Sequence, residues 1–304
     1  MKNHVHAVLS VCGAVFLFGL GSTILKIIYT RFPDVPIINI LSLRIGITAI
    51  AYFLTALVRN PKALRVRTSD LLYFTIFGTA GIFVVQYFLT LAVKNINVAL
   101  ATFVQSSATL LICAYSVVVL RERMSRHKIA ALTIGFVGLS VIFWRPDLFT
   151  ASRMLSTGLL AAVLSAVGKA FYILYGKKGS VKYDRSIMMA YGLLATTLLS
   201  VAISSPVPTI LAYRDHVDFW LLVAALGLLC SYAPFSLYFR GLARLPSSTA
   251  GILNIIEPVA GTMTAFLILH ESITLQQLIG CLLIMAGIVV MQLEHMGKKT
   301  DIKT

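Results

Sequence analysis

The chain has 304 residues, of which 58% are hydrophobic and only 12% charged, and its mean hydropathy is +0.89. Because soluble domains carry roughly 25% charged residues, this composition excludes an ordinary soluble globule. The net charge of +15 would favour a nucleic-acid partner in a soluble protein, but most of the basic residues lie in short segments between apolar runs. We therefore expect an integral membrane protein that binds the lipid bilayer and no nucleic acid.

Ten apolar runs, bounded by charged residues, Pro and Gly, are each long enough to approach the ~20 residues that a membrane-spanning helix needs. Open sheets would leave backbone groups unpaired in lipid, so all ten runs are predicted to be helices. The predicted fold class is an all-α polytopic membrane protein. In chain order the spans are Val5–Tyr29, Pro36–Val58, Leu71–Ala92, Val98–Leu120, Ile129–Trp144, Thr157–Gly176, Ser186–Ser204, Val217–Phe239, Ser247–Leu269 and Leu275–Leu293.

The distribution of basic residues predicts the orientation of these spans. If the N-terminus is cytoplasmic, eighteen of the 26 Lys and Arg residues lie on the cytoplasmic side and six on the other, while Arg44 and Lys169 fall within spans. Positive residues are retained on the cytoplasmic side, so both termini are expected there. The first run lacks an evident cleavage site and is read as a span rather than a signal peptide.

The chain resembles itself when it is shifted by 149 residues. Leu120, Glu122, Gly138 and Val141 fall on Leu269, Glu271, Gly287 and Val290, and Ala101 falls on Ala250. Five spans in each half is an odd number, so the two halves must have opposite orientations in the membrane. Inverted repeats of this kind are typical of secondary transporters, whose site lies near the midplane.

The repeated segments carry a resemblance to a known family. Its residues are Leu91–Asn95, Val98–Ala101, Leu120–Arg123 and Gly135–Gly138, then Tyr238–Ala243, Ala250, Glu257–Pro258, Leu269–Glu271, Gly280 and Gly287. In this pattern the chain resembles the drug/metabolite transporter superfamily, specifically its ten-helix EamA type. Because Thr109 stands where Pro258 stands in the second half, the sequence leaves open whether the helix breaks of the two halves correspond.

The resemblance implies export or exchange of amino acids, amines, nucleotides or other small metabolites, in a bacterial cytoplasmic membrane. The expected organisation is a first five-helix repeat over residues 1–144, a connecting loop over 145–156, a second repeat over 157–294 and a cytoplasmic tail over 295–304. The chain has no phosphate-binding loop of the GxxxxGK[ST] type, and its four cysteines lack metal-ligand spacing. We expect no cofactor, no metal and no direct use of ATP.

Two charged residues within spans are the main candidates for a functional site. Glu257 lies halfway along the ninth span, directly before Pro258, and Lys169 lies in the middle of the sixth. Charges at this depth are costly and normally face a cavity or a partner. Glu257 is a candidate for binding substrate or a coupling proton, and Lys169 for binding a substrate carboxylate or phosphate. The alternative is a structural ion pair of Glu257 with Lys169 or Arg44.

Polar residues on neighbouring spans complete the candidate site. Asn254 lies one turn before Glu257, and Gln105 is its equivalent under the 149-residue shift, so the two amides are expected to face each other. Pro258 removes a backbone donor and frees a carbonyl for an ion or substrate. Arg44 is expected to tie helix ends to backbone carbonyls.

A stripe on the eighth span is the last candidate. Ser231, Pro234, Phe235 and Tyr238 share one helical face, which would line either a pocket or the lipid. The predicted substrate-binding residues are Lys169, Glu257, Asn254, Gln105, Tyr172, Gln86, Ser231 and Tyr238, with Glu257 also the coupling-ion site.

The leading hypothesis is a secondary active transporter of a small metabolite, an exporter or exchanger that works by alternating access. The alternatives are a broad-specificity exporter of lipophilic cations, and a pore or transporter subunit without coupling. A lone Glu257 in an aromatic cavity would suit cations, whereas Lys169 in the same cavity would suit anionic or zwitterionic substrates. An enzyme is not expected, because the six histidines lie at helix ends or in tails.

Overall fold

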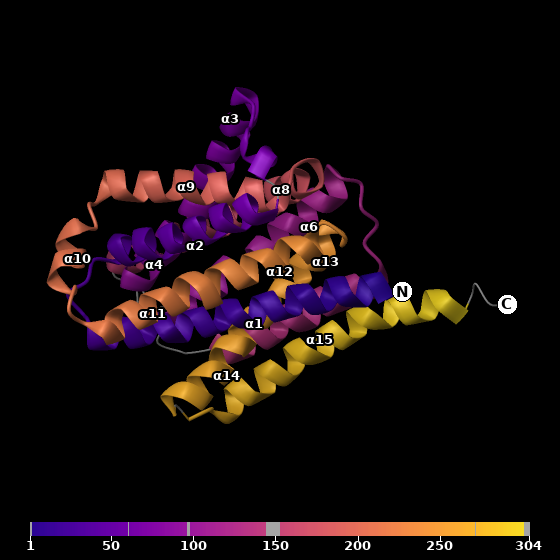
Figure 1. Cartoon of the computed structure of the whole chain (residues 1–304). Coiled ribbons are helices and arrows are strands. Elements are labelled where there is room, and N and C mark those ends of the chain that lie inside the picture. Colours follow the sequence, from indigo (N-terminus) through magenta and orange to yellow (C-terminus); the bar gives the residue numbers. More distant parts are fainter. Residues whose placement is uncertain (1, 60, 96–97, 144–152, 271, 301–304) are drawn as a thin grey trace.

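The computed structural model describes residues 2–59, 61–95, 98–143, 153–270 and 272–300, and within these ranges it is helical, with no strand (Figure 1). Each predicted span is helical over most of its described residues; Pro36, Val119, Leu120 and Ser204 at span ends lie outside the helices, and Ser107 interrupts the fourth span. The first half contains α1 (Lys2–Arg31), α2 (Ile37–Arg59), η1 (Pro61–Leu64), α3 (Thr68–Ile76), η2 (Phe77–Phe83), α4 (Val84–Asn95), α5 (Val98–Ser106), α6 (Ala108–Val118) and α7 (Arg126–Phe143). The second contains α8 (Arg153–Lys182), α9 (Arg185–Ile203), α10 (Val207–Ala212), α11 (Val217–Gly227), η4 (Leu228–Tyr232), α12 (Ala233–Leu242), α13 (Ser247–Leu253), η5 (Asn254–Ile256), α14 (Glu257–Leu269) and α15 (Leu275–Thr300).

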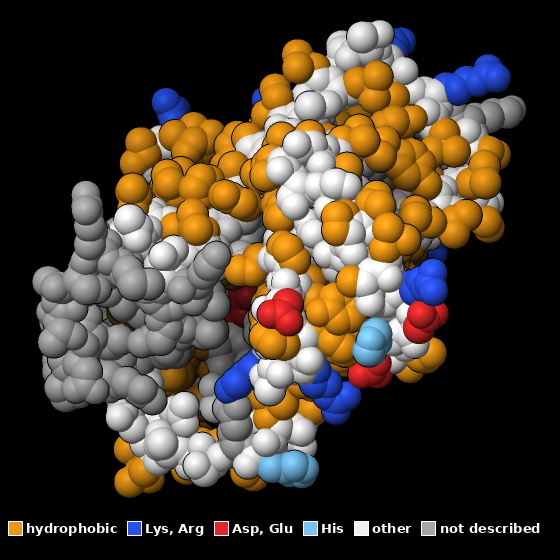
Figure 2. Space-filling model, turned by 90° about the vertical axis from the view of Figure 1, so that its left-hand side faces the viewer, with side chains coloured by type: hydrophobic (Ala, Val, Ile, Leu, Met, Phe, Trp, Pro, Cys, Tyr) orange, Lys and Arg blue, Asp and Glu red, His pale blue; other side chains and the backbone are white. Residues whose placement is uncertain are grey.

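Eight continuous helical stretches in the described residues are long and apolar enough to cross a membrane. The remaining two predicted spans correspond to α7 and α15, which pack along each other. Large side chains such as Leu54, Leu198 and Leu221 are exposed, and Figure 2 shows hydrophobic side chains over much of one face. A soluble surface would not expose so many, so the protein is a multi-pass membrane protein whose outer faces meet lipid.

Helices of the first half pack mainly on helices of the second. The most extensive contacts besides α7 with α15 join α2 to α9, α4 to α8, and α1 to both α12 and α14. Figure 1 shows α1 running beside α11 and α12. Shifted by 149 residues, the pair α4 and α8 becomes α12 and α1, so these contacts recur under exchange of the two halves.

The irregular turns of the helices recur at the same shift. The π-helical segments η2 and η4 fall on each other, and the break at Ser107 between α5 and α6 falls on the 3-10 segment η5. The helix breaks of the two halves therefore correspond, although Thr109 replaces the proline. A proline interrupts a regular helix because it lacks an amide donor, but packing against neighbouring helices can also produce an irregular turn.

A threonine from a neighbouring helix stabilises each π-helical region. Thr196 on α9 donates to the carbonyl of Gly78 at 2.8 Å, and Thr48 on α2 donates to the carbonyl of Gly227 at 2.9 Å. A Cβ atom at Gly78 would overlap the backbone carbonyl of Gly192 on α9, and one at Gly227 would crowd the Ile47 side chain and the Arg44 carbonyl on α2. Glycine is therefore required for the close approach that brings these hydroxyl groups within hydrogen-bond distance.

Candidate functional site

A partly buried ion pair links the two halves of the molecule. The Nζ atom of Lys169 on α8 lies 2.7 Å from the Oε2 atom of Glu257 at the start of α14. Their side chains are 15% and 25% exposed, so both charges remain accessible to small molecules. Of the alternatives left by the sequence, the structure shows the pairing of Glu257 with Lys169 rather than with Arg44.

Hydrogen bonds extend this pair across two further helices. Lys169 also donates to the side-chain oxygen of Gln105 on α5 at 3.4 Å, and the Gln105 amide nitrogen donates to the hydroxyl of Ser165 at 2.8 Å. Ser165 in turn donates to the carbonyl of Val85 on α4 at 2.9 Å. Ser165 was not among the predicted site residues, although it lies one turn before Lys169 on the same helical face. Together these groups hold the Lys169 ammonium in one position.

The helix changes its winding just before Glu257. The last turn before this residue is the 3-10 segment η5, and α14 begins at Glu257 itself. The carbonyl of Asn254, which Pro258 cannot bond, accepts from the amide of Glu257. The prediction that this carbonyl is free for a ligand is therefore corrected, because the tighter turn provides it with a donor.

The two predicted amides do not bond to each other in the described residues. The Asn254 amide donates to the hydroxyl of Tyr238 at 2.8 Å and to the carbonyl of Ala250 at 3.0 Å, whereas Gln105 bonds Ser165 and Lys169. Each amide is thus satisfied on its own side of the bundle. The sequence symmetry relates their positions without making them partners.

The stripe on the eighth span faces protein rather than lipid. Ser231, Phe235 and Tyr238 are 1%, 3% and 1% exposed. Tyr172, three residues after Lys169 on α8, packs against Phe235 and Phe239, with ring centroids 6.2 and 5.3 Å apart. Its buried hydroxyl has no hydrogen-bond partner in the described part of the chain, so it is a polar group available to a ligand.

Arg44 lies apart from the ion pair. Its side chain is buried on α2, and its Nη2 atom donates to the side-chain oxygen of Gln86 on α4 at 2.6 Å. The expectation that Arg44 bonds backbone carbonyls is corrected, since its partner is a side-chain amide. Its Nε atom has no partner among the described residues. Gln86 is therefore the hydrogen-bond partner of Arg44, and it forms no hydrogen bond with Lys169 or Glu257 in the described residues.

A second polar cluster surrounds Glu122, the repeated acidic residue of the first half. Its carboxylate accepts from the amides of Ser247 and Ser248 at 2.9 and 3.2 Å and from the Ser248 hydroxyl at 2.7 Å, and Lys177 lies 3.7 Å away. Burial raises the pKa of Glu122, but these hydrogen bonds and Lys177 together hold that pKa below its ordinary value. The cluster joins the start of α13 and Lys177 of α8 to the segment between α6 and α7. Glu271, its equivalent, lies outside the described residues.

No group of three His, Cys, Asp or Glu side chains gathers to hold a metal ion in the ranges that the structure describes. The polar groups gathered between the two halves are instead an ion pair and side-chain amides, with aromatic side chains beside them. This arrangement, with irregular helices beside a buried charged site, is that of a polytopic membrane transporter.

Comparison with known proteins identifies the family. A model of the EamA-like transporter family matches residues 6–144 and again residues 156–293. The chain therefore belongs to the EamA-like transporter family, which confirms the resemblance drawn from its sequence, and it is a membrane transporter.

Several known proteins are similar along much of the chain. The uncharacterized inner membrane transporter YicL of Salmonella typhimurium is 25% identical over 230 residues, 74% of each chain. The threonine/homoserine exporter RhtA of Escherichia coli is 23% identical over 241 residues, 77% of each chain. A solved crystal structure at 23% identity has a TM-score of 0.76 and covers 95% of this chain and 98% of its own. That structure shows the same fold.

Proposed function

We propose that this protein is a secondary active transporter that exports or exchanges a small zwitterionic metabolite of the amino acid class by alternating access. The observation that carries the proposal is the partly exposed pair of Lys169 and Glu257 between the two halves. An amino acid presents one carboxylate and one ammonium group. Its carboxylate takes the place of Glu257 beside Lys169, and its ammonium takes the place of Lys169 beside Glu257, so every charge keeps a counter-charge.

The same electrostatic argument disfavours a lipophilic cation as substrate. A cation that occupies Glu257 leaves Lys169 without its counter-charge, and removing one partner of a buried pair costs about 3–5 kcal/mol. A proton on Glu257 has the same consequence. Exchange of one zwitterion for another therefore fits the site better than proton coupling through this carboxylate. The similarity to RhtA, named as a threonine/homoserine exporter, supports the same substrate class.

Alternating access requires two halves that rock about a central site, and we propose ten spans in two inverted five-helix repeats. The recurrence of helix packing, of π-helical segments and of helix breaks supports this architecture. The two separate family matches support it as well. The distribution of basic residues favours a cytoplasmic membrane with both termini in the cytoplasm.

Labelling of introduced cysteines tests the inverted topology. Arg123→Cys and Ser272→Cys stand 149 residues apart, and both native side chains are exposed. In cells expressing a variant without the four native cysteines, we expect a membrane-impermeant maleimide to label Ser272→Cys from outside and Arg123→Cys only after permeabilisation. Equal labelling of both from one side would contradict the inverted repeats.

Counterflow in proteoliposomes tests the function. We expect saturable uptake of a labelled amino acid that is accelerated by unlabelled amino acid inside the vesicles, since an exchanger returns loaded. A panel of amines, nucleotides and cationic dyes is measured in parallel, with and without a pH gradient. Dye uptake driven by the gradient would favour the lipophilic-cation exporter instead. Uptake without acceleration or saturation would indicate a pore.

A further inference from the structure

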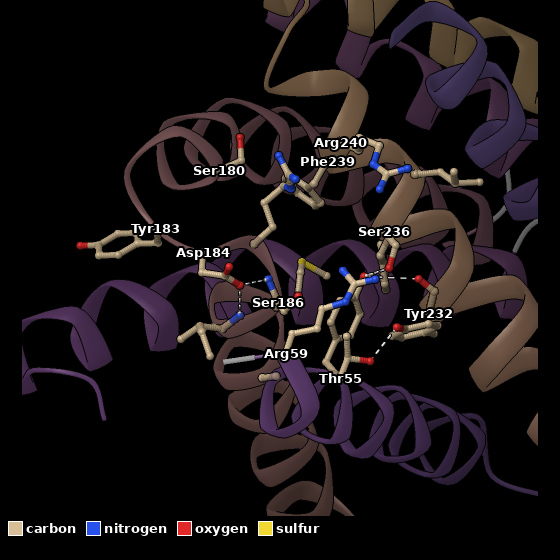
Figure 3. A pocket seen from close by; sticks show the side chains of 17 residues that line it. Thr55, Arg59, Ser180, Tyr183, Asp184, Ser186, Tyr232, Ser236, Phe239 and Arg240 are labelled. Carbon is tan, nitrogen blue, oxygen red and sulfur yellow. Dashed lines mark hydrogen bonds between the residues drawn. The ribbon is translucent and has the colours of Figure 1, made fainter. Parts of the chain in front are cut away.

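A cavity of about 400 Å³ lies between α2, α8, α9 and α12 (Figure 3), and neither Lys169 nor Glu257 lines it. Its lining comes from the end of α2, the end of α8, the start of α9, Tyr232 of η4 and residues 235–240 of α12. These helix segments belong to the end of the molecule that the basic residues predict to be cytoplasmic. Of the residues that the sequence singled out, Phe235 of the eighth-span stripe lines it, whereas none of the eight predicted substrate-binding residues does.

Three arginines from three different helices line this cavity. Arg59 is the last residue of α2, Arg185 is the first of α9, and Arg240 lies in the last turn of α12; Figure 3 labels Arg59 and Arg240. In the described part of the chain, none of the three forms an ion pair with a carboxylate. The cavity therefore gathers cationic groups that lack a counter-charge.

The carboxylate at the cavity does not neutralise them. Asp184 uses its Oδ1 atom to cap α9, accepting from the amides of Ser186 and Ile187 at 2.8 and 3.3 Å. The cavity is thus lined by three arginines and one aspartate, and the aspartate carboxylate is already hydrogen-bonded to the first amides of α9. Arginine binds phosphate and carboxylate oxygens in pairs of parallel hydrogen bonds, so an anion is the ligand that suits this charge.

The inner wall of the cavity carries side-chain hydroxyl groups and aromatic rings. The hydroxyl groups of Tyr52 and Ser236 lie 2.7 Å apart, as do those of Thr55 and Tyr232, and the rings of Tyr52 and Tyr232 are 4.7 Å apart. Tyr52 lies seven residues before Arg59, which places it about 10 Å deeper along α2. An anion at the arginines can therefore carry an apolar portion that extends into the membrane-spanning part of the bundle.

We propose that this cavity binds a phosphate-bearing amphiphile, with the phosphate at Arg59, Arg185 and Arg240 and the apolar portion along Tyr52 and Phe235. The general excess of basic residues on the cytoplasmic side accounts for single arginines at helix ends. It does not account for three, from three different helices, that line the same cavity. The phosphate comes either from an acidic phospholipid or from a soluble organic phosphate.

The test measures thermal unfolding of the purified protein in detergent during titration with dihexanoyl-phosphatidylglycerol. We expect saturable stabilisation of the wild-type protein, and an apparent Kd about a hundredfold weaker in the triple variant Arg59→Gln, Arg185→Gln and Arg240→Gln. Dihexanoyl-phosphatidylcholine, which carries the same chains without net charge, should not stabilise either protein.

A matched variant, Arg65→Gln, Arg67→Gln and Arg126→Gln, loses the same charge from exposed positions outside the cavity. We expect it to bind as the wild type does. Equal weakening in both triple variants, or no saturable effect of phosphatidylglycerol on the wild type, would overturn the proposal. Competition by glycerol phosphate would assign the site to soluble organic phosphates, and its absence would assign it to the phospholipid.

Discussion

Replacing either partner of the central ion pair, in Lys169→Met or Glu257→Gln, is expected to lower counterflow at least about a hundredfold. Each single variant leaves one charge buried without its partner, because the two side chains are only 15% and 25% exposed. We expect the free energy of unfolding to fall by about 3 kcal/mol in each single variant. The measurements are substrate counterflow in proteoliposomes and thermal or chemical unfolding in detergent.

The double variant Lys169→Met with Glu257→Gln separates structure from function. It removes both charges, so we expect most of the lost stability to return while transport stays absent. A purely structural pair would instead regain transport together with stability, and that outcome would contradict the proposed site. The exposed pair of Arg214 and Asp215 at 3.0 Å, with side chains 71% and 83% exposed, is the control. Neutralising either of its members should cost less than about 1 kcal/mol.

Gly78→Ala is expected to destabilise the protein by about 3 kcal/mol. A Cβ atom at Gly78 would overlap the carbonyl oxygen of Gly192, which is backbone and has no rotamer to move to. Relief requires η2 and α9 to separate, and separation also removes the hydrogen bond from Thr196 to the Gly78 carbonyl. The measurement is the unfolding temperature of the purified protein in detergent.

Gly261→Ala is the matched control, because a Cβ atom at this α14 position meets nothing within 4 Å. The substitution should leave stability unchanged or raise it by up to about 1 kcal/mol, the usual advantage of Ala over Gly in a helix. Gly227→Ala, the equivalent of Gly78→Ala in the second half, should fall between the two. Its Cβ atom would lie 2.8 Å from the Ile47 side chain and 3.0 Å from the Arg44 carbonyl. Equal stability of Gly78→Ala and Gly261→Ala would show that the contact between Gly78 and the Gly192 carbonyl is not tight.

The sequence was sufficient to find the helices and their order. The thickness of the bilayer sets the length of an apolar run, and its apolar interior excludes charges from the run and leaves polar residues to the connecting segments. Both properties are visible in the sequence without knowledge of how the helices pack. The same reasoning found Lys169 and Glu257, since a charge in the middle of an apolar run is conspicuous. The 149-residue repeat in turn predicted which helices correspond.

The partners of those residues were decided by the tertiary structure alone. Lys169 and Glu257 are 88 residues apart, and no local pattern distinguishes Glu257 from the other sites that Lys169 might reach if the helices packed otherwise. The pairing of Arg44 with Gln86 and the gathering of Arg59, Arg185 and Arg240 have the same origin. Periodicity assigns a side chain to a face of its own helix, whereas packing of the helices determines which faces meet.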